Sequence, residues 1–202
     1  MCATDVNKTK LRIFGPREIS AKAVMASTCY PTIYQAVEID GSYYWDGGYM
    51  GNPALDPLVT RVDDILTVLI DPLDIEDGPP TTPRQIVNRI NEVSFSASWV
   101  LEMCQIELIN QLLDDGLLQE GKYRKKRFHL IRNDRFMEQI GAASKQNPSR
   151  DFIYELHDVG WQAADTWIAE NFARVGIEST CRIEEDVKQR LKPSFIADPL
   201  GG

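Results

Sequence analysis

Hydrophobic and polar positions alternate in a way that predicts strands in the N-terminal third of the chain. In residues 10–14, basic and apolar side chains alternate, which is typical of a strand with one buried face. Two β-prone runs, 36–39 and 43–45, flank Asp40-Gly41. Because an Asp-Gly pair accepts the positive φ angles of a tight turn, this pattern predicts a β-hairpin.

Two further runs predict strands in the middle of the chain. Residues 65–70 are apolar with little polar alternation, which favours a strand that is covered on both faces and paired in parallel. Residues 127–131 are interpreted as another strand. The segment 71–83 follows the first of these strands and is rich in Asp, Gly and Pro. We expect it to be a mobile loop that lies over or beside a site.

Helix signals occupy most of the remaining chain. Ser20 can cap a short helix over residues 21–26. Thr82-Pro83 together with Gln85 has the pattern of a capping box and predicts the start of a long helix. Gly116 is a suitable end for that helix, because glycine readily adopts the left-handed conformation of a C-terminal cap.

Each of two long helices carries an apolar stripe, with steps of three and four residues, which we expect to face a core. The stripe of the first helix consists of Ile86, Ile90, Val93, Ala97, Leu101, Cys104, Leu108 and Leu112. The second helix opens at Asn147-Pro148, and its stripe consists of Phe152, Leu156, Val159, Ala163 and Trp167. Gly160 weakens the middle of the second helix, and nothing in the sequence explains it.

Strands that alternate with helices predict an α/β layer structure. Only a few strands can be parallel, so we expect a short, mostly parallel sheet with a β-hairpin and long packing helices. Because such a sheet leaves an exposed edge, the chain is interpreted as part of a larger fold, and we expect it to aggregate or oligomerise. We divide it into residues 1–71, a mainly helical part with one or more strands at 72–192, and a tail at 193–202.

Composition and charge narrow the functional class. The 202 residues are 43% hydrophobic and 26% charged, as in an ordinary globular protein. The net charge of −8 has the wrong sign for a broad nucleic-acid surface, so no nucleic-acid partner is expected. No apolar run approaches the ~20 residues of a membrane span, and the N-terminus has no apolar signal region. The four cysteines are far apart, and we interpret them as free thiols in a cytoplasmic protein.

The stretch with the most distinctive chemistry is Asp46-Gly47-Gly48, directly after a predicted strand. Glycine permits sharp turns and the close approach of a partner. Such a turn can present a carboxylate to a hydroxyl group or a water molecule as a general base. Asp and Gly also dominate ordinary turns, so a simple surface turn is the alternative on the tripeptide alone.

The context of this motif is more specific than the motif itself. A small-residue segment that includes a proline, 26–32, precedes the Asp-Gly hairpin, Asp46-Gly47-Gly48 and Asn52-Pro53. This order resembles the second half of the patatin-like phospholipase family, especially its bacterial members, in which a hairpin delivers a D-G-G or D-G-A motif. The opening Ala3-Thr4-Asp5 is similar to the family's entry into this region. Three later segments, 128–131, 144–147 and 175–180, resemble the C-terminal extension of one bacterial subgroup.

The resemblance implies a partial three-layer α/β fold and a serine acyl hydrolase that cleaves carboxylic esters of lipids without a cofactor or a metal ion. In that family a serine within G-x-S-x-G and an aspartate form the catalytic pair, and a glycine run forms the oxyanion hole. Asp46 corresponds to the general base, Gly47 and Gly48 shape its turn, and Asn52-Pro53 matches the Asn-Pro that follows the motif. Residues 1–71 then correspond to the C-terminal part of the hydrolase core and 72–192 to the subgroup's extension.

The sequence departs from the family's pattern at the nucleophile. It contains no G-x-S-x-G and no glycine run before Asp46. Since loss of a nucleophile costs several orders of magnitude in rate, we expect a fragment or truncated gene product with no appreciable esterase activity of its own. Two alternatives are a non-catalytic module that binds lipid or a partner, and an enzyme in which another polypeptide supplies the serine.

Other residues with potential chemistry are interpreted as structural. Ser27 lacks the strained elbow of a nucleophile, and Cys29 is expected to be a small buried hydrophobe. His129 and His157 are far apart in sequence, and nothing around them supports a Ser-His-Asp triad. An acidic loop has no coordinating pattern, so no metal site is expected there. Its residues are Asp71, Asp74, Glu76 and Asp77.

One basic run stands out against the acidic background. It contains Lys122, Arg124, Lys125, Lys126 and Arg127. Each basic side chain near an anionic membrane contributes roughly 1 kcal/mol of attraction, so the run is a candidate contact with lipid headgroups and would make the protein peripheral to the membrane. A solvated loop that leads into a strand is the alternative.

Overall fold

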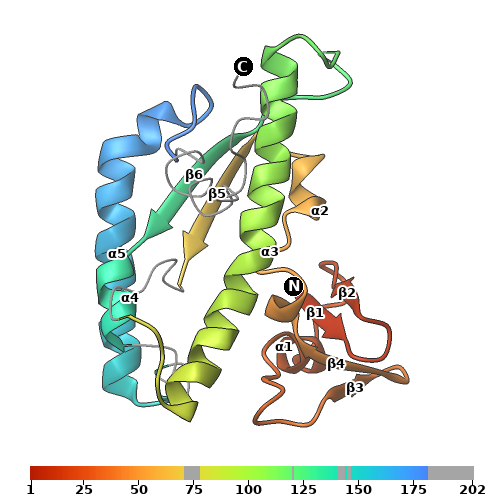
Figure 1. The fold of residues 1–202 in the computed structure, drawn as a ribbon, viewed down its shortest axis with the longest axis vertical. Helices are drawn as coiled ribbons and strands as arrows, with labels where there is room; N and C mark the ends of the chain where they lie inside the picture. Colours follow the sequence, from red (N-terminus) through yellow and green to blue (C-terminus); the bar gives the residue numbers. More distant parts are fainter. Residues whose placement is uncertain (71–77, 120, 141–143, 145–146, 182–202) are drawn as a thin grey trace, which may run out of the picture.

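The computed structural model describes residues 1–70, 78–119, 121–140, 144 and 147–181, and its chain runs through two packed parts (Figure 1). The N-terminal part is an antiparallel sheet with a short helix. The second part is a parallel pair of strands that lies between two long helices (Figure 1). The predicted α/β class is therefore confirmed. The predictions for Asp71, Asp74, Glu76 and Asp77 and for the tail at 193–202 lie outside the described residues.

The antiparallel sheet has the strand order β2-β1-β4-β3. Its strands are β1 (Cys2–Asp5), β2 (Lys10–Ile13), β3 (Val37–Ile39) and β4 (Ser42–Asp46). The predicted hairpin is confirmed, because β3 and β4 pair on either side of Asp40 and Gly41, whose φ angles are 50° and 77°. Asp tolerates a positive φ better than most residues and Gly tolerates it without strain, so this pair fixes the turn.

Helix α1 (Ala21–Ser27) packs on this sheet. The predicted cap is confirmed, since the Ser20 hydroxyl accepts a hydrogen bond from the backbone N–H of Ala23 at 3.2 Å. The small helix residues Ala23 and Ala26 are buried beside Ala3 and Tyr44 of the sheet. Their size lets the helix backbone lie close to the strands, so this small core holds the end of β4 in place.

The parallel pair consists of β5 (Asp64–Leu69) and β6 (Arg127–Arg132). Parallel pairing is confirmed, but the prediction that residues 65–70 are covered on both faces is wrong. Leu66 and Val68 remain 49% and 61% exposed, whereas Ile65 and Thr67 on the opposite face are buried. Helix α5 (Arg150–Asn171), the second long helix, lies alongside β6 rather than over β5, so one face of β5 stays open (Figure 1).

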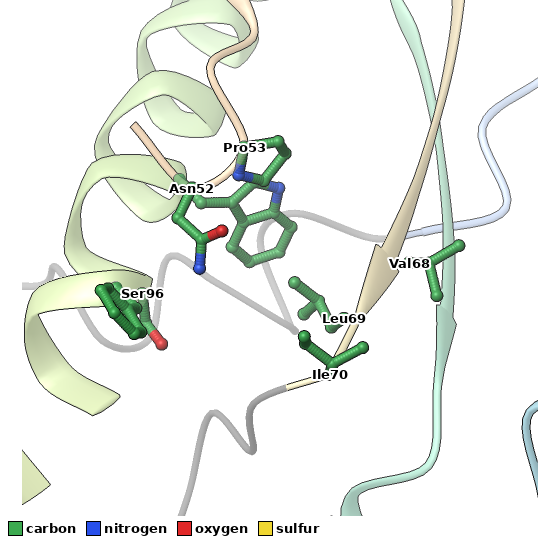
Figure 2. A pocket seen from close by; sticks show the side chains of 8 residues that line it. Asn52, Pro53, Val68, Leu69, Ile70 and Ser96 are labelled. Carbon is green, nitrogen blue, oxygen red and sulfur yellow. The ribbon is translucent and has the colours of Figure 1, made fainter. Parts of the chain in front are cut away.

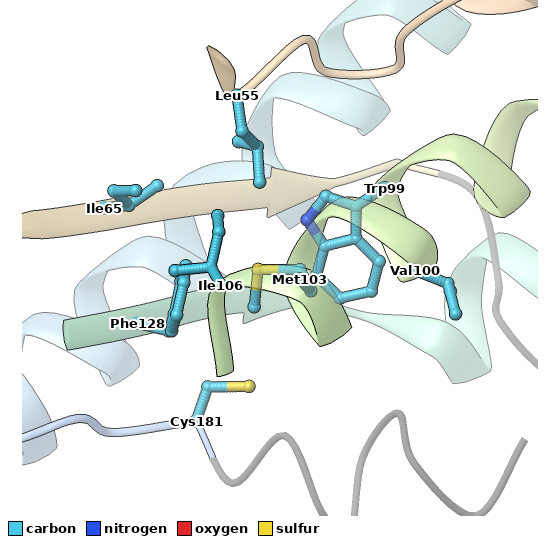
Figure 3. Close-up of a cluster of buried hydrophobic side chains, with 8 residues drawn as sticks. All are labelled: Leu55, Ile65, Trp99, Val100, Met103, Ile106, Phe128 and Cys181. Carbon is cyan, nitrogen blue, oxygen red and sulfur yellow. The ribbon is translucent and has the colours of Figure 1, made fainter. Parts of the chain in front are cut away.

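Helix α3 (Pro83–Asp114) runs past both parts of the structure (Figure 1). Its start is as predicted, because Thr82 and Gln85 form a reciprocal capping box. Gly116 follows its end with a φ of 70°. One face of α3 supplies Trp99, Met103 and Ile106 to the main hydrophobic core, where they meet side chains of β5 and β6 (Figure 3).

The prediction of which face of α3 is buried is wrong, because the predicted apolar stripe lies on the exposed face of the helix. Its members Ile86, Ile90, Val93, Leu101 and Leu108 are between 42% and 59% exposed. The buried face is instead Asn91, Glu92, Phe95, Trp99, Val100, Met103, Ile106, Asn110 and Leu113. Because α3 is apolar on opposite sides, steps of three and four residues fit both faces, and spacing alone cannot choose between them.

Of the remaining helices, the one that follows β4 belongs to the N-terminal part, where it packs against β1, and the others complete the second part. They are η1 (Gly47–Tyr49), α2 (Asp56–Val59), α4 (Asp134–Ile140), α5 (Arg150–Asn171) and η3 (Phe172–Arg174). The predicted stripe of α5 lies toward β6, but its members are only half-buried. Among the described residues, no helix combines the length and apolarity needed to cross a bilayer.

The two faces of α3 predict different responses to truncation. Ile106→Ala removes a buried side chain and should lower the free energy of unfolding by about 2–4 kcal/mol. Leu108→Ala, two residues away on the exposed face, should change it by less than ~0.5 kcal/mol. Urea denaturation followed by circular dichroism measures both. An equal or larger loss for Leu108→Ala would contradict this assignment of the faces.

Candidate functional site

Asp46 is held at the end of β4 by three backbone contacts. It pairs with Ala3 of β1, its carbonyl oxygen accepts a hydrogen bond from the Thr4 hydroxyl at 2.8 Å, and its N–H donates to the carbonyl oxygen of Cys29 at 2.9 Å. Cys29 lies just after α1, so sheet and helix both position the residue. This convergence fixes the Asp46 backbone from segments that are far apart in the sequence.

The carboxylate of Asp46 also shapes the turn that follows it. Its Oδ1 accepts a hydrogen bond from the backbone N–H of Gly48 at 2.8 Å and so caps η1. Both glycines are required by close packing. A Cβ at Gly47 would lie 2.6 Å from the carbonyl oxygen of Cys2, and one at Gly48 would lie 2.9 Å from the ring of Phe95.

A cavity of about 700 Å³ opens beside this turn. Asp46 and Gly48 line it together with Asn52, with the loop after α1, including Tyr30, and with the first turns of α3, including Phe95. Its volume lies within the range typical of ligand sites, ~300–1,000 Å³. Asp46 is therefore a partly buried carboxylate on the wall of a cavity that is large enough for an organic substrate.

Aromatic side chains pack at the base of the turn. Tyr49 lies edge-on to Phe95, with ring centroids 5.0 Å apart, and Tyr30 contacts both rings. The Tyr49 hydroxyl donates a hydrogen bond to Oδ1 of Asn91 at 3.0 Å, and burial raises the pKa of Tyr49 well above its ordinary value. Tyr49 thus stays protonated at neutral pH and links the motif to α3. The sequence analysis did not identify Asn91 as a site residue. Its only signal was that it is polar and lies outside the predicted apolar stripe of α3.

The Asn52-Pro53 pair lies between the sheet and α3, next to the Asp46 cavity. The backbone N–H of Asn52 donates to the Ser98 hydroxyl at 3.1 Å. Asn52 lines the Asp46 cavity, and both residues border a smaller adjoining space with Leu69 and Ile70 (Figure 2). The structure therefore brings all five predicted site residues, from Asp46 to Pro53, to one region beside α3.

Cys29 and Ser27 have surroundings that fit structural roles. Cys29 is buried, its Sγ donates to the carbonyl oxygen of Gln35 at 3.2 Å, and burial raises its pKa. A thiol with a raised pKa is a poor nucleophile at neutral pH. Ser27 is the last residue of α1, and its neighbour Thr28 lines the Asp46 cavity.

His129 takes part in a different cluster, which is centred on Asp64. Its Nε2 lies 3.0 Å from Oδ1 of Asp64, and its Nδ1 lies 2.9 Å from the Thr180 hydroxyl. Arg127 binds both oxygens of Asp64, at 2.9 and 2.7 Å, and the N–H of Gly176 donates to Oδ1 at 2.8 Å. The hydrogen bonds from Arg127, supported by those from His129 and Gly176, hold the pKa of Asp64 well below its usual range.

This Asp64 cluster has a structural role, in which it links segments that are distant in the sequence, and it is separate from the Asp46 site. It joins β5, β6 and the segment 176–180, where the Ser179 hydroxyl accepts a further hydrogen bond from the backbone N–H of Phe128 at 3.1 Å. His157 lies elsewhere, on exposed α5 beside Asp158. Within the described ranges, no group of three potential metal-binding side chains occurs.

Most of the predicted basic run is engaged in intramolecular ion pairs. Arg124 and Lys126 both bind Asp63, at 3.2 and 3.3 Å, and Lys125 binds Asp114. Arg127 binds Asp64, as described above. Lys126 is also buried, and its Nζ donates to the carbonyl oxygen of Val62 at 2.7 Å. These carboxylates neutralise much of the positive charge that the sequence suggests for this surface.

The Asp64 cluster predicts an acid-sensitive contribution to stability. The pKa of Asp64 is lowered in the folded state. The stabilisation that Asp64 gives is therefore complete above the ordinary aspartate pKa of about 4, and it is lost as the pH falls below that value. Asp64→Asn should reduce the free energy of unfolding by roughly 1.5–3 kcal/mol at pH 7, and the deficit should shrink toward pH 3. Urea titrations at several pH values test this, with the exposed Asp165→Asn on α5 as control. A deficit that does not depend on pH would refute it.

One protein family matches the part of the chain that carries Asp46. Residues 4–59 match the family model described as Patatin-like phospholipase, a segment that runs from β1 through α1 and the D-G-G turn to α2. A search of curated proteins gave no match. The family match and the geometry agree in placing the distinctive part of this chain around Asp46. The comparison thus supports, for residues 4–59, the lipid hydrolase family of patatin-like phospholipases.

Proposed function

We propose that this chain supplies the general base of a lipid acyl hydrolase and that Asp46 is that base. The observation that supports the proposal most directly is the position of Asp46, fixed by β1 and α1 on the wall of a cavity of about 700 Å³. The family match of residues 4–59 supports the same class of reaction.

The chemistry requires a serine hydroxyl within hydrogen-bond reach of Asp46. The carboxylate takes the hydroxyl proton as the oxygen attacks the ester carbonyl, and it later activates a water molecule that hydrolyses the acyl-enzyme. This sequence has no G-x-S-x-G. The proposal therefore assigns the serine and the oxyanion donors to a different polypeptide or to chain beyond this sequence.

The walls of the cavity support an ester with an apolar chain. Next to the polar turn at Asp46, the lining includes Ile33, Tyr34, Val87 and Phe95. Ile33, Tyr34 and Val87 are each more than 40% exposed, so they offer apolar surface that a hydrocarbon chain could cover. The lining therefore combines a carboxylate with apolar side chains, as a lipid ester with a polar and an apolar part requires.

A non-catalytic binding module is the second candidate, and one observation favours it. Oδ1 of Asp46 already caps the N–H of Gly48, which is what an ordinary turn aspartate does. In that case the residue is needed for the turn, and its acid-base properties are irrelevant. The two candidates differ in whether activity, or only stability, depends on the carboxylate.

A chimera separates these candidates. Residues 4–59 of this chain would replace the matching segment of an active patatin-like hydrolase, and turnover of a fluorogenic ester would be measured. We expect the chimera to be active and Asp46→Asn to reduce its kcat by at least about 10²-fold. Asp40→Asn is the matched control in the same hairpin, because Asn also tolerates a positive φ, and it should retain activity.

The outcome that would overturn the proposal is equally specific. Asp46→Asn and Asp40→Asn chimeras with equal activity would show that the carboxylate is a turn residue only. The isolated chain provides a second arm, in which we expect no ester turnover above that of its Asp46→Ala variant. Robust turnover of the isolated chain that Asp46→Ala abolishes would place a nucleophile within this sequence and contradict the assignment of the serine elsewhere.

Contact with an anionic membrane surface through the basic run stays a prediction, with the protein acting in the cytoplasm. Arg124, Lys125, Lys126 and Arg127 are paired with carboxylates, so we expect weak binding that 0.5 M salt abolishes. Co-sedimentation with phosphatidylserine vesicles tests it, with phosphatidylcholine vesicles as control. Replacement of Lys122 and Arg124 by Ser should reduce sedimentation. Equal sedimentation with both kinds of vesicle would remove the basic run from the account.

A further inference from the structure

A second cavity lies on the other side of the parallel strands, where α4 and α5 approach the ends of β5 and β6. Its volume is about 270 Å³. Apart from Arg132, Asn133 and Ser144, the described residues that line it are apolar. Its main members are Ile131, Met137, Ile140, Phe152, Leu156 and Val159. Figure 1 shows that α4 and α5 lie beside β6, away from the antiparallel sheet that carries Asp46.

Small residues on α5 leave this space open. Gly160 and Ala163 line the cavity between larger side chains of the same helix. A Cβ added at Gly160 would meet nothing within 4 Å. Glycine lowers the stability of a helix interior, and the sequence offered no reason for Gly160. In the structure, Gly160 keeps this space open.

Two polar residues of the lining connect this cavity with a neighbouring polar hollow. Arg132 and Asn133 line the apolar cavity and also an adjoining polar hollow of about 400 Å³, which includes Gln162 and Thr166. Nε of Arg132 lies 3.4 Å from a carboxylate oxygen of Asp134, so the guanidinium is held at this rim. Glu170 lines the polar hollow as well, so the site has an apolar interior and a polar, hydrogen-bonding mouth in which Arg132 lies close to acidic side chains.

We infer that this cavity binds a single medium-length hydrocarbon chain whose polar head lies at Arg132 and Asn133. The cavity is open to solvent at Val68 and Ile70, which are each 61% exposed, so an alkyl chain that covers them removes apolar surface from water. Each buried methylene contributes about 0.8 kcal/mol, which makes affinity depend on chain length. A free fatty acid and an acyl ester share this chemistry.

The inference does not rest on the role of Asp46. The Asp46 cavity lies next to α3 and the antiparallel sheet, and Ile70 at the end of β5 lines both cavities. Because Ile70 is the one described lining residue that the two cavities share, binding at α5 can be present whether or not Asp46 acts as a base. A test that measures binding without ester turnover keeps the two proposals separate.

Methyl NMR on methionine provides that test. The chain has five methionines, of which Met137 lines the α5 cavity, Met103 is in the main core and Met25 is exposed on α1. Titration of the full chain with decanoate, below its critical micelle concentration, should shift the Met137 methyl resonance saturably. The resonances of Met103 and Met25 should not move. No shift at Met137, or equal shifts at all three residues, would overturn the inference.

A matched pair of variants on α5 locates the binding. Ala163→Phe fills the cavity and should weaken decanoate binding at least tenfold. Ala169→Phe adds the same ring to an exposed position of α5 and should leave binding unchanged. Thermal melts confirm folding, and Gly160→Leu is a second filling variant if Ala163→Phe unfolds. Unchanged affinity in a folded filling variant would refute the assignment.

The polar rim is tested by comparing two ligands. Decanoate carries a carboxylate, and methyl decanoate has the same chain without charge. If the site takes a free fatty acid, Arg132→Ala should weaken decanoate at least fivefold and leave methyl decanoate unchanged. Equal affinity for both ligands in the wild-type chain would identify an ester site instead. Failure of both ligands to bind would reject the proposed chain chemistry altogether.

Discussion

The pairing of β1 with β4 is the constraint on which the rest of the site depends. It aligns Ala3 with Asp46, lets the Thr4 hydroxyl bind the Asp46 carbonyl oxygen and brings Cys2 so close to Gly47 that no side chain fits there. Hairpin closure alone would leave the end of β4 free to move. Because β1 is the first strand of the chain, the aspartate is positioned by residues more than forty positions away, and an N-terminal deletion would release it.

Helix α3 connects this N-terminal part to the parallel strands. It packs Phe95 against the D-G-G turn and Ile106 in the main core, so the cavity at Asp46 and the fold share one support. Its opposite face and one face of β5 expose apolar side chains, including Leu101 and Val68. Parallel sheets are usually covered on both faces, and contiguous exposed apolar surface marks an interaction site. Association of the chain with a further polypeptide or another copy through these faces stays a prediction.

Local signals in the sequence predicted local structure well. The Asp40-Gly41 turn and the capping box at Thr82 depend on the conformational preferences of a few adjacent residues, and both form as expected. The burial of α3 and β5 was predicted wrongly, because it depends on which elements are present to cover each face. The role of Asn91 and the space beside Gly160 depend on tertiary packing that no residue spacing encodes. Grouping of the site residues from Asp46 to Pro53 followed from their closeness in sequence.

The most direct measurement of the central claim is chemical rescue of an Asp46→Ala chimera that contains residues 4–59. Removal of the side chain leaves room at the cavity wall for a small carboxylate. If Asp46 is a general base, formate should restore ester turnover in a saturable manner, with a rate that rises with the ionised fraction of formate, while chloride at the same ionic strength has no effect. A folded Asp46→Ala chimera that formate leaves inactive, or that is fully active without it, would contradict the account.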